Sequence, residues 1–526
     1  MSILITSLPY RKSIPSSAIN TVFLEPNNWD DYGYKTLFQT VFFDHVGVKH
    51  YLGSIKIGFC GQNSGWTSHA LENSFEKLPE IFFSLGQDAD FYRNLVDKFP
   101  LEIVSNLLSS LNDVVFDTNL LNLANNENVF QASLLRSVNS TVIKNQFQRI
   151  LKNEAPLTDF NFTYEKSSND RYSGIKLNFS VEPHSKPPSN IHVLIGRNGV
   201  GKTTLLNNMV DALLPDRGSD EQTGFFSTIL SSWGAPVKFK EDYFAGIVSI
   251  SFSAFDPFLP PKDQKDANAG MKYTYVGLKK RTINTDDESW VVKSKDDLAK
   301  DFASSLKLCL SLTAKSNRWE KAVKKLESDF NFAEMNLCSL LEIYKVDMNI
   351  DKNEFYTASM RLFNRMSSGH AIVLLTITRL VETVEEKTLV LLDEPESHLH
   401  PPLLSAFTRA LSDLLTNRNG VAIIATHSPV LLQEVPKACV SIIRRIRLTS
   451  TIDRPESETF AENVGVLTRE VFGLEVTKSG YHELLERSVS DGKTYEEIET
   501  EYHNQLGFEG KAILRAMINL KNSDLG

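Results

Sequence analysis

Residues 191–210, IHVLIGRNGVGKTTLLNNMV, contain the pattern G-x-x-x-x-G-K-[ST] between an apolar strand and a predicted helix. Its glycines let backbone N–H groups surround phosphate oxygens, and the following helix adds the positive end of its dipole. We expect Lys202 to reach the β- and γ-phosphates and the Thr203 hydroxyl to ligate Mg²⁺. The expected phosphate-binding residues are Gly196, Arg197, Asn198, Gly199, Gly201, Lys202, Thr203 and Thr204. This segment predicts a nucleoside triphosphate site in an α/β fold.

A second segment, TLVLLDEPESHLHP (388–401), places two carboxylates at the end of an apolar strand. In parallel sheets, ligands bind at the carboxyl ends of the strands. We expect Asp393 to hold Mg²⁺ and Glu394 to act as the general base that polarises the attacking water. An acidic pair alone is more typical of a helix cap, and the glycine-rich loop upstream favours the catalytic interpretation.

A third apolar strand, in VAIIATHSP (421–429), ends at His427. One crossover helix separates it from the acidic strand, so the two strands can be parallel neighbours and His427 can sense the γ-phosphate. His398 and His400 form an H-x-H pair. A zinc site needs further ligands that the sequence does not indicate, so we expect these histidines to line the loop after the acids.

The segment MSSGHA (366–371) precedes the apolar run IVLLTITRLVE. Serine at the start of an apolar helix is common, so a capping role is the simplest interpretation. The N–H groups around Ser367, Ser368 and Gly369 also suit an anion. Because the other motifs are present, we expect this segment both to cap the helix and to contact an anion.

The composition is that of an ordinary globular chain of 526 residues, with 41% hydrophobic residues and a formal net charge of −9. This charge predicts no general attraction to nucleic acid, so such binding would need a local patch. The best candidate patch, Arg444, Arg445 and Arg447, is better explained as a blunted edge strand. Four scattered cysteines and the absence of a roughly 20-residue apolar stretch predict a cytoplasmic protein outside the membrane.

The pattern is strand-like over residues 20–60, helical over 70–155, and alternating around the glycine-rich loop. It predicts a mixed β-sheet with flanking helices and an antiparallel β subdomain. We expect an N-terminal α+β region (1–155) of unknown role and an ATPase domain (156–450) with a mostly helical insertion at about 255–360. A C-terminal helical region (451–526) follows.

Together the four motifs resemble those of ABC-type ATPase heads, within the branch of SMC- and RecF-like repair ATPases, OLD proteins and anti-phage ATPases. The layout is most similar to the PtuA ATPases of Septu and retron-associated modules. The resemblance implies ATP and Mg²⁺ between two heads, with Ser367, Ser368 and Gly369 of one head completing the site of the other. The family's Q-loop glutamine is missing, and Ser253 or Asp256 is the candidate replacement.

The resemblance also implies a sensor or scaffold that controls a separate HNH-type nuclease, because no Toprim or HNH pattern occurs in this chain. Nucleic acid, including retron RNA or DNA, is a further candidate partner. The alternative is an SMC- or RecF-like repair ATPase that acts directly on DNA. A transporter subunit is disfavoured by the missing Q-loop glutamine and the large N-terminal region.

Overall fold

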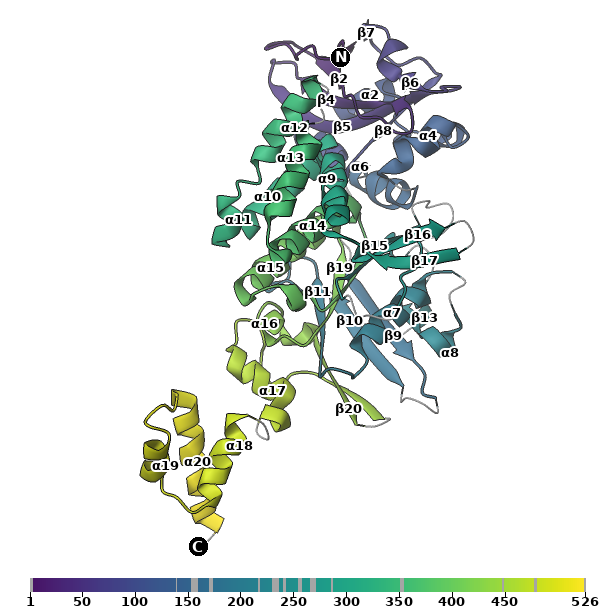
Figure 1. The fold of residues 1–526 in the computed structure, drawn as a ribbon. Helices are drawn as coiled ribbons and strands as arrows, with labels where there is room; N and C mark the ends of the chain where they lie inside the picture. Colours follow the sequence, from purple (N-terminus) through teal and green to yellow (C-terminus); the bar gives the residue numbers. More distant parts are fainter. Residues whose placement is uncertain are drawn as a thin grey trace.

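The computed structural model describes residues 3–138, 140–152, 159–169, 174–215, 218–228, 236–239, 243–253, 258–264, 271–284, 287–350, 354–446, 449–476 and 480–524. At its centre lies a seven-stranded sheet in the order β15-β14-β18-β19-β11-β20-β21 (Figure 1). Its strands are β11 (Ile191–Ile195), β14 (Gly246–Ser251), β15 (Lys272–Gly277), β18 (Thr388–Asp393), β19 (Val421–Thr426), β20 (Val440–Ile446) and β21 (Thr449–Asp453).

Every neighbouring pair from β15 to β20 is parallel, and β21 alone pairs antiparallel, with β20. Parallel strands with both faces covered are apolar along their whole length. Accordingly, all five residues of β11 and all six of β19 are buried. The carboxyl ends of these strands therefore lie at one edge of the sheet, where the motif residues follow them.

One face of the sheet packs on helices and the other on a second sheet. The helical layer includes α9 (Lys295–Ser311), α10 (Thr313–Leu326), α14 (Ser368–Thr383) and α15 (Pro401–Arg418). The opposite face packs on α7 (Lys202–Leu213) and on the antiparallel sheet β10-β9-β12-β13. Those strands are β9 (Phe160–Lys166), β10 (Ile175–Val181), β12 (Phe225–Thr228) and β13 (Val237–Lys238), with α8 (Asp220–Thr223) nearby. The predicted fold class, an α/β ATPase head with an antiparallel subdomain, is confirmed.

The insertion between β14 and α14 is mostly helical. Besides β15, α9 and α10 it contains β16 (Lys279–Asn284), β17 (Asp287–Val292), α11 (Phe330–Glu334), α12 (Ser339–Ile350) and α13 (Glu354–Arg365). Its strand β15 joins the central sheet, while β16 and β17 form a separate antiparallel pair.

Residues 3–152 form an N-terminal sheet unit with its own core. Its six strands run in the order β7-β1-β2-β4-β5-β8, and the expected helices follow only after β8. The strands are β1 (Leu4–Ser7), β2 (Thr21–Pro26), β4 (Leu37–Phe43), β5 (Lys49–Phe59), β7 (Ser74–Phe75) and β8 (Phe82–Gly86), with a small pair of β3 (Tyr34–Lys35) and β6 (Gly65–Trp66). The helices are α1 (Ala89–Lys98), α2 (Leu101–Ser110), α3 (Thr118–Ala124), α4 (Asn128–Ala132), α5 (Ser140–Val142) and α6 (Gln148–Leu151).

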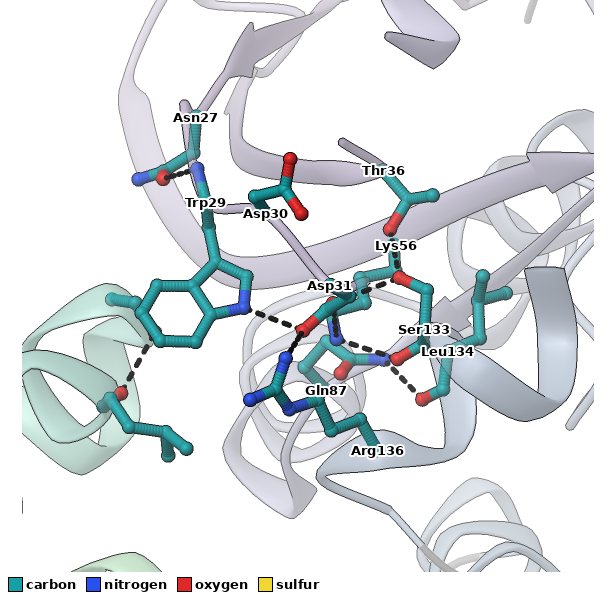
Figure 2. A network of polar contacts seen from close by, with 12 residues as sticks. Asn27, Trp29, Asp30, Asp31, Thr36, Lys56, Gln87, Ser133, Leu134 and Arg136 are labelled. Carbon is teal, nitrogen blue, oxygen red and sulfur yellow. Dashed lines mark hydrogen bonds and ion pairs between the residues drawn. The ribbon is translucent and has the colours of Figure 1, made fainter. Parts of the chain in front are cut away.

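A buried charge network stabilises the loop between β2 and β3 in this unit (Figure 2). Asp31 accepts from Lys56 Nζ at 2.6 Å, from Arg136 at 2.7 Å and from the Trp29 indole at 2.7 Å. Burial raises the pKa of Asp31, but the Lys56 ammonium and these hydrogen bonds outweigh that effect and lower it. The carboxylate is thus ionised, and its bonds tie the loop to β5 and to Arg136, which follows α4.

The C-terminal part departs from the predicted boundary at 450. Strand β21 continues the sheet to Asp453, and α17 (Val464–Val476) packs on α16 (Pro429–Leu432) in the helical layer. Only α18 (Tyr481–Ser490), α19 (Tyr495–Glu501) and α20 (Phe508–Asp524) form a separate small core, at the far end from the N-terminal sheet unit (Figure 1). Among the described helices, none is long and apolar enough to cross a membrane.

Arg444 and Arg445 of the arginine cluster lie on β20, which is the second strand from the edge of the sheet and not the edge strand itself. This strand pairs with β11 only over Val440–Ile442, whereas Arg444 and Arg445 are in register with Thr451 and Ser450 of β21 alone. Arg444 bonds the Asp453 carboxylate on β21 at 2.6 Å and the Glu470 carbonyl at 3.2 Å. Arg447 lies outside the described residues.

Asp88 joins the N-terminal sheet unit to the rest of the molecule. It caps α1, and its carboxylate contacts Arg318 of α10 at 2.5 Å and Arg418 of α15 at 3.1 Å. All three side chains are buried. Burial by itself raises the pKa of Asp88, but the two guanidinium groups hold it well below its usual range. One carboxylate therefore connects three elements that are far apart in the sequence.

Replacing Asp88 by Asn should destabilise the protein by about 3 kcal/mol, because two buried guanidinium groups lose their counter-charge. The measurement is the denaturation midpoint in urea. Since the folded pKa is lowered, the stabilisation is fully present above about pH 4 and is lost only in acid as the folded carboxylate protonates. The matched control is Asp97→Asn, an exposed position on the same helix. Equal midpoints for the two variants would contradict the prediction.

Candidate nucleotide site

The loop between β11 and α7 has the backbone shape that its glycines predict. Gly199 and Gly201 have φ of +80° and +98°, a conformation that side-chain-bearing residues rarely adopt, and Gly201 directly precedes α7. At Gly196, a Cβ atom would lie 2.3 Å from the Ile443 carbonyl oxygen on β20. The first glycine is therefore required for close packing against the neighbouring strand, and the other two for the turn.

Lys202 lies inside this loop, with only 4% of its surface exposed. Its ammonium donates to the Gly196 carbonyl at 2.9 Å and to the Arg197 carbonyl at 3.0 Å. Burial lowers the pKa of Lys202, while the carboxylates of Glu394, Glu396 and Asp393 act in the opposite direction. The loop thus brings one cation into the field of three carboxylates. Arg197, Asn198, Gly199 and Thr204 lie exposed on the rim of the loop, and Thr203 is half-buried.

The acidic residues follow β18 at the same sheet edge. Asp393 is the last residue of that strand and is in register with Ala425 of β19. Glu394 has φ +45° and ψ +57°, a left-handed conformation that costs a non-glycine residue on the order of 1–3 kcal/mol. Its N–H donates to the Ala425 carbonyl at 2.9 Å. The chain turns sharply here into a short 3-10 helix (Pro395–His398), which keeps Glu394 beside the neighbouring strand.

Sequence analysis missed Glu396, which holds the His427 segment in place. One of its oxygens accepts from the Thr426 hydroxyl at 2.6 Å and from the His427 N–H at 2.7 Å. The same oxygen lies 3.2 Å from His427 Nδ1, whereas the nearest Glu394 oxygen is at 3.8 Å. In the sequence Glu396 is only one more acid in a polar turn, and its partners lie 30 residues along the chain.

The helix that begins after Ser367 presents the expected serines at the surface. Ser367 caps α14, and its hydroxyl lies 2.6 Å from Nδ1 of His370. Ser367 and Ser368 are exposed. At Gly369 a Cβ atom would lie 2.3 Å from the His398 carbonyl oxygen, so this glycine lets α14 approach the 3-10 helix that follows Glu394. The His370 N–H donates to the Ser367 hydroxyl at 3.4 Å, which leaves the N–H groups of Ser368 and Gly369, without acceptors inside the helix, for an anion.

Of the two Q-loop candidates, Ser253 lies just beyond the carboxyl end of β14, whose Ser251 is in register with Asp393. Asp256 lies outside the described residues. Neither assignment is tested by these contacts, and the replacement for the glutamine stays a prediction.

The arrangement of glycine-rich loop, lysine and strand-end carboxylates is that of a P-loop ATPase. Residues 246–433 match a family model described as "AAA domain, putative AbiEii toxin, Type IV TA system". The chain is 46% identical to protein ea59 of Escherichia phage lambda over 516 residues, which is 96% of each chain. It therefore belongs to the family of that phage protein.

Solved structures similar to this chain include ATP-binding cassettes and an SMC head. An ATP-binding cassette of an ABC transporter in its ADP conformation covers 61% of this chain and 98% of its own, at 13% identity and a TM-score of 0.30. The SMC head bound to the C-winged helix domain of ScpA covers 56% of this chain and 96% of its own, at 11% identity and a TM-score of 0.27.

Replacing Glu396 by Ala should lower ATP turnover by between about tenfold and 100-fold, because the His427 segment loses the carboxylate that positions it. Glu396→Gln keeps an acceptor oxygen, so its rate of ATP turnover should lie between those of Glu396→Ala and the wild type. Steady-state phosphate release at saturating ATP measures the effect. The control is Ser397→Ala, the exposed neighbour on the same turn. Wild-type turnover in Glu396→Ala would refute a positioning role.

Proposed function

We propose that this chain binds Mg-ATP at the loop of residues 196–204 and hydrolyses it with Glu394 as general base. The observation that carries the proposal is the single buried ammonium of Lys202 in the field of three carboxylates, at the edge where parallel strands end. In this assignment the ammonium leaves the loop carbonyls for the β- and γ-phosphates. Backbone N–H groups of the loop and the N-terminus of α7 hold the remaining phosphate charge.

The residues around Lys202 fit a magnesium ion. Mg²⁺ binds hard oxygen ligands, and Asp393 with the Thr203 hydroxyl supplies such oxygens. Three carboxylates against one ammonium leave excess negative charge for a divalent cation to balance. In addition, the second oxygen of Glu396 is buried and accepts no hydrogen bond from the described residues. When bound, the ion would neutralise charge on the phosphates.

Glu394 and His427 have separate roles in this mechanism. Glu394 accepts a proton from water while the water oxygen attacks the γ-phosphorus, and the bond to the leaving ADP oxygen breaks. His427, positioned by Glu396, contacts the γ-phosphate from the strand between the loop and the acids. Asp393 is the last residue of β18. The left-handed backbone of Glu394 turns the chain there, so the Glu394 carboxylate does not continue the line of the strand.

We further propose that two copies close around two ATP molecules, each completing the other's site with Ser367, Ser368 and Gly369. The support is that both serines are exposed at the N-terminus of a 16-residue helix, a location that suits a phosphate. Gly369 is already packed against its own chain at His398, so the helix start is held in position before a partner arrives.

For the biological role, we propose a sensor or scaffold that controls a separate effector nuclease of the HNH type in anti-phage defence. The motifs that resemble PtuA ATPases support this role, and so does a family model whose description names a putative toxin of a toxin–antitoxin system. In this assignment the chain has no nuclease site of its own. The alternative, a repair ATPase that binds DNA or RNA directly, requires salt-sensitive binding by the chain alone.

Lys202→Ala should abolish ATP binding, whereas Glu394→Gln should bind ATP normally and hydrolyse it about 100-fold more slowly or worse. Removing the ammonium deletes a phosphate contact, while the amide only fails to accept the proton. Equilibrium binding of a fluorescent ATP analogue and single-turnover hydrolysis separate the two effects. The proposal fails if Lys202→Ala keeps wild-type affinity or Glu394→Gln keeps wild-type turnover.

Mixing Ser367→Arg subunits with Lys202→Ala subunits tests the site shared between two copies. Each variant alone should be inactive, because both of its sites lack one half. A mixed dimer contains one intact site, so an equal mixture should recover up to about a quarter of the wild-type rate. Phosphate release is measured against each variant alone. Absence of any recovery, with dimers verified by mass measurement, would exclude action across the interface.

A further inference from the structure

Three metal-ligating side chains from distant parts of the sequence meet beside Ser367. Asp329 caps α11, His370 lies in the first turn of α14, and His400 caps α15 directly after the segment that carries the acids. Nε2 of His370 lies 3.1 Å from one Asp329 oxygen, and Nε2 of His400 lies 3.1 Å from the other. Sequence analysis considered His400 only with His398, which is not part of this cluster.

The separations of these atoms suit a single transition-metal ion. Zinc bonds of 2.0–2.2 Å to nitrogen and oxygen place neighbouring ligand atoms about 3.3 Å apart. Each histidine Nε2 lies 3.1 Å from a different oxygen of Asp329, and one ligand atom from each of the three residues lies within 4.8 Å of the other two. Because the His400 side chain is 47% exposed, a small rotation of its ring can bring Nε2 closer to the other two ligand atoms.

Groups behind the cluster orient two of the three ligands. The Ser367 hydroxyl lies 2.6 Å from Nδ1 of His370, the ring nitrogen that faces away from Asp329. Asp329 accepts from the N–H groups of Asn331 at 3.0 Å and Phe332 at 3.1 Å. Metal-bound histidine typically makes such a hydrogen bond through its other ring nitrogen, and metal-bound carboxylates are themselves hydrogen-bonded. Both kinds of hydrogen bond are present at this cluster.

The cluster is closed on the protein side and open toward solvent. The side chains of Asp329 and His370 are 9% and 11% exposed, whereas His400 is half-exposed. Three protein ligands with one open side leave a position for water or for a group from another molecule. A purely structural zinc site would instead have four protein ligands.

We propose that Asp329, His370 and His400 bind a divalent transition-metal ion of the zinc type at the junction of α11, α14 and α15. Binding places the hydrogen of the His370 ring on Nδ1, from which it donates to the Ser367 oxygen. The Ser367 hydroxyl hydrogen is then released from the ring and can point outward. In the tautomer whose Nε2 donates to Asp329, Nδ1 instead accepts a hydrogen bond from the Ser367 hydroxyl.

The proposed metal site lies where three helices meet. It ties the helical insertion, the Ser367 helix and the helix that follows the acidic segment into one unit. If the proposed function holds, the ion prepares Ser367 to donate to the partner-bound γ-phosphate. Metal binding itself requires neither ATP nor a second copy, so it can be tested independently of that function.

The test is a zinc titration of untagged, chelator-treated full-length protein in competition with a chromophoric indicator and without nucleotide. Wild type should bind one equivalent of Zn²⁺. His400→Ala should weaken binding by on the order of 100-fold because it removes a ligand, and Asp329→Asn should weaken it because a neutral amide oxygen replaces the anionic carboxylate. The matched control His398→Ala, two residues from His400, should bind zinc as the wild type does. Thermal unfolding without zinc verifies that His400→Ala, changed at a half-exposed position, still folds.

Two further readouts identify the ligands. Co²⁺ in place of Zn²⁺ should give visible absorption in the wild type and lose it in His400→Ala. Ser367→Ala should keep the stoichiometry and weaken affinity by roughly tenfold, as expected for an outer hydrogen bond. The proposal is overturned if the wild type binds no zinc, or if folded His400→Ala binds it as tightly as the wild type. In either case the cluster is a set of hydrogen bonds only.

Discussion

The parallel pairing of β19 with β11 on one side and β18 on the other is the constraint on which the site depends. Ile195 is in register with Thr426, and Asp393 with Ala425. Because all three strands point the same way, the glycine-rich loop, His427 and the acids leave the sheet at one edge. A shift in this register would move the carboxylates away from Lys202. The fully apolar β11 and β19, buried on both faces, maintain the pairing.

Buried charges stabilise the outer parts of the molecule around that sheet. Asp88 connects the N-terminal sheet unit to α10 and α15, and Asp31 holds a loop within the unit itself. In each case a buried carboxylate contacts two cations, of which at least one is itself buried, so removing the carboxylate leaves uncompensated charge. His400 caps the start of α15, and Arg418 is the last residue of that helix. The contact between Asp88 and Arg418 therefore lies at the opposite end of α15 from His400 and the acidic segment.

Sequence analysis located the elements correctly where a pattern is contiguous. The strand and helix on either side of residues 196–201 are present, and the acidic pair and His427 each follow an apolar strand as expected. It failed where a residue acts through a distant partner. Glu396 was overlooked because its hydrogen bonds reach the end of another strand. Strand β8 was read as helix because its five residues, FFSLG, are all buried and show no alternation.

The sequence by itself determined the fold class and the candidate nucleotide site, since strand–loop–helix order and glycine placement are local properties. Only the tertiary structure decided which strands are neighbours, which strand is the edge, and which side chains converge. It showed that the arginines of β20 pair with β21, beyond the point where the pairing of β20 with β11 ends. It also brought Asp329, His370 and His400 together. Such convergence depends on how helices pack on the sheet, and no spacing along the chain records that packing.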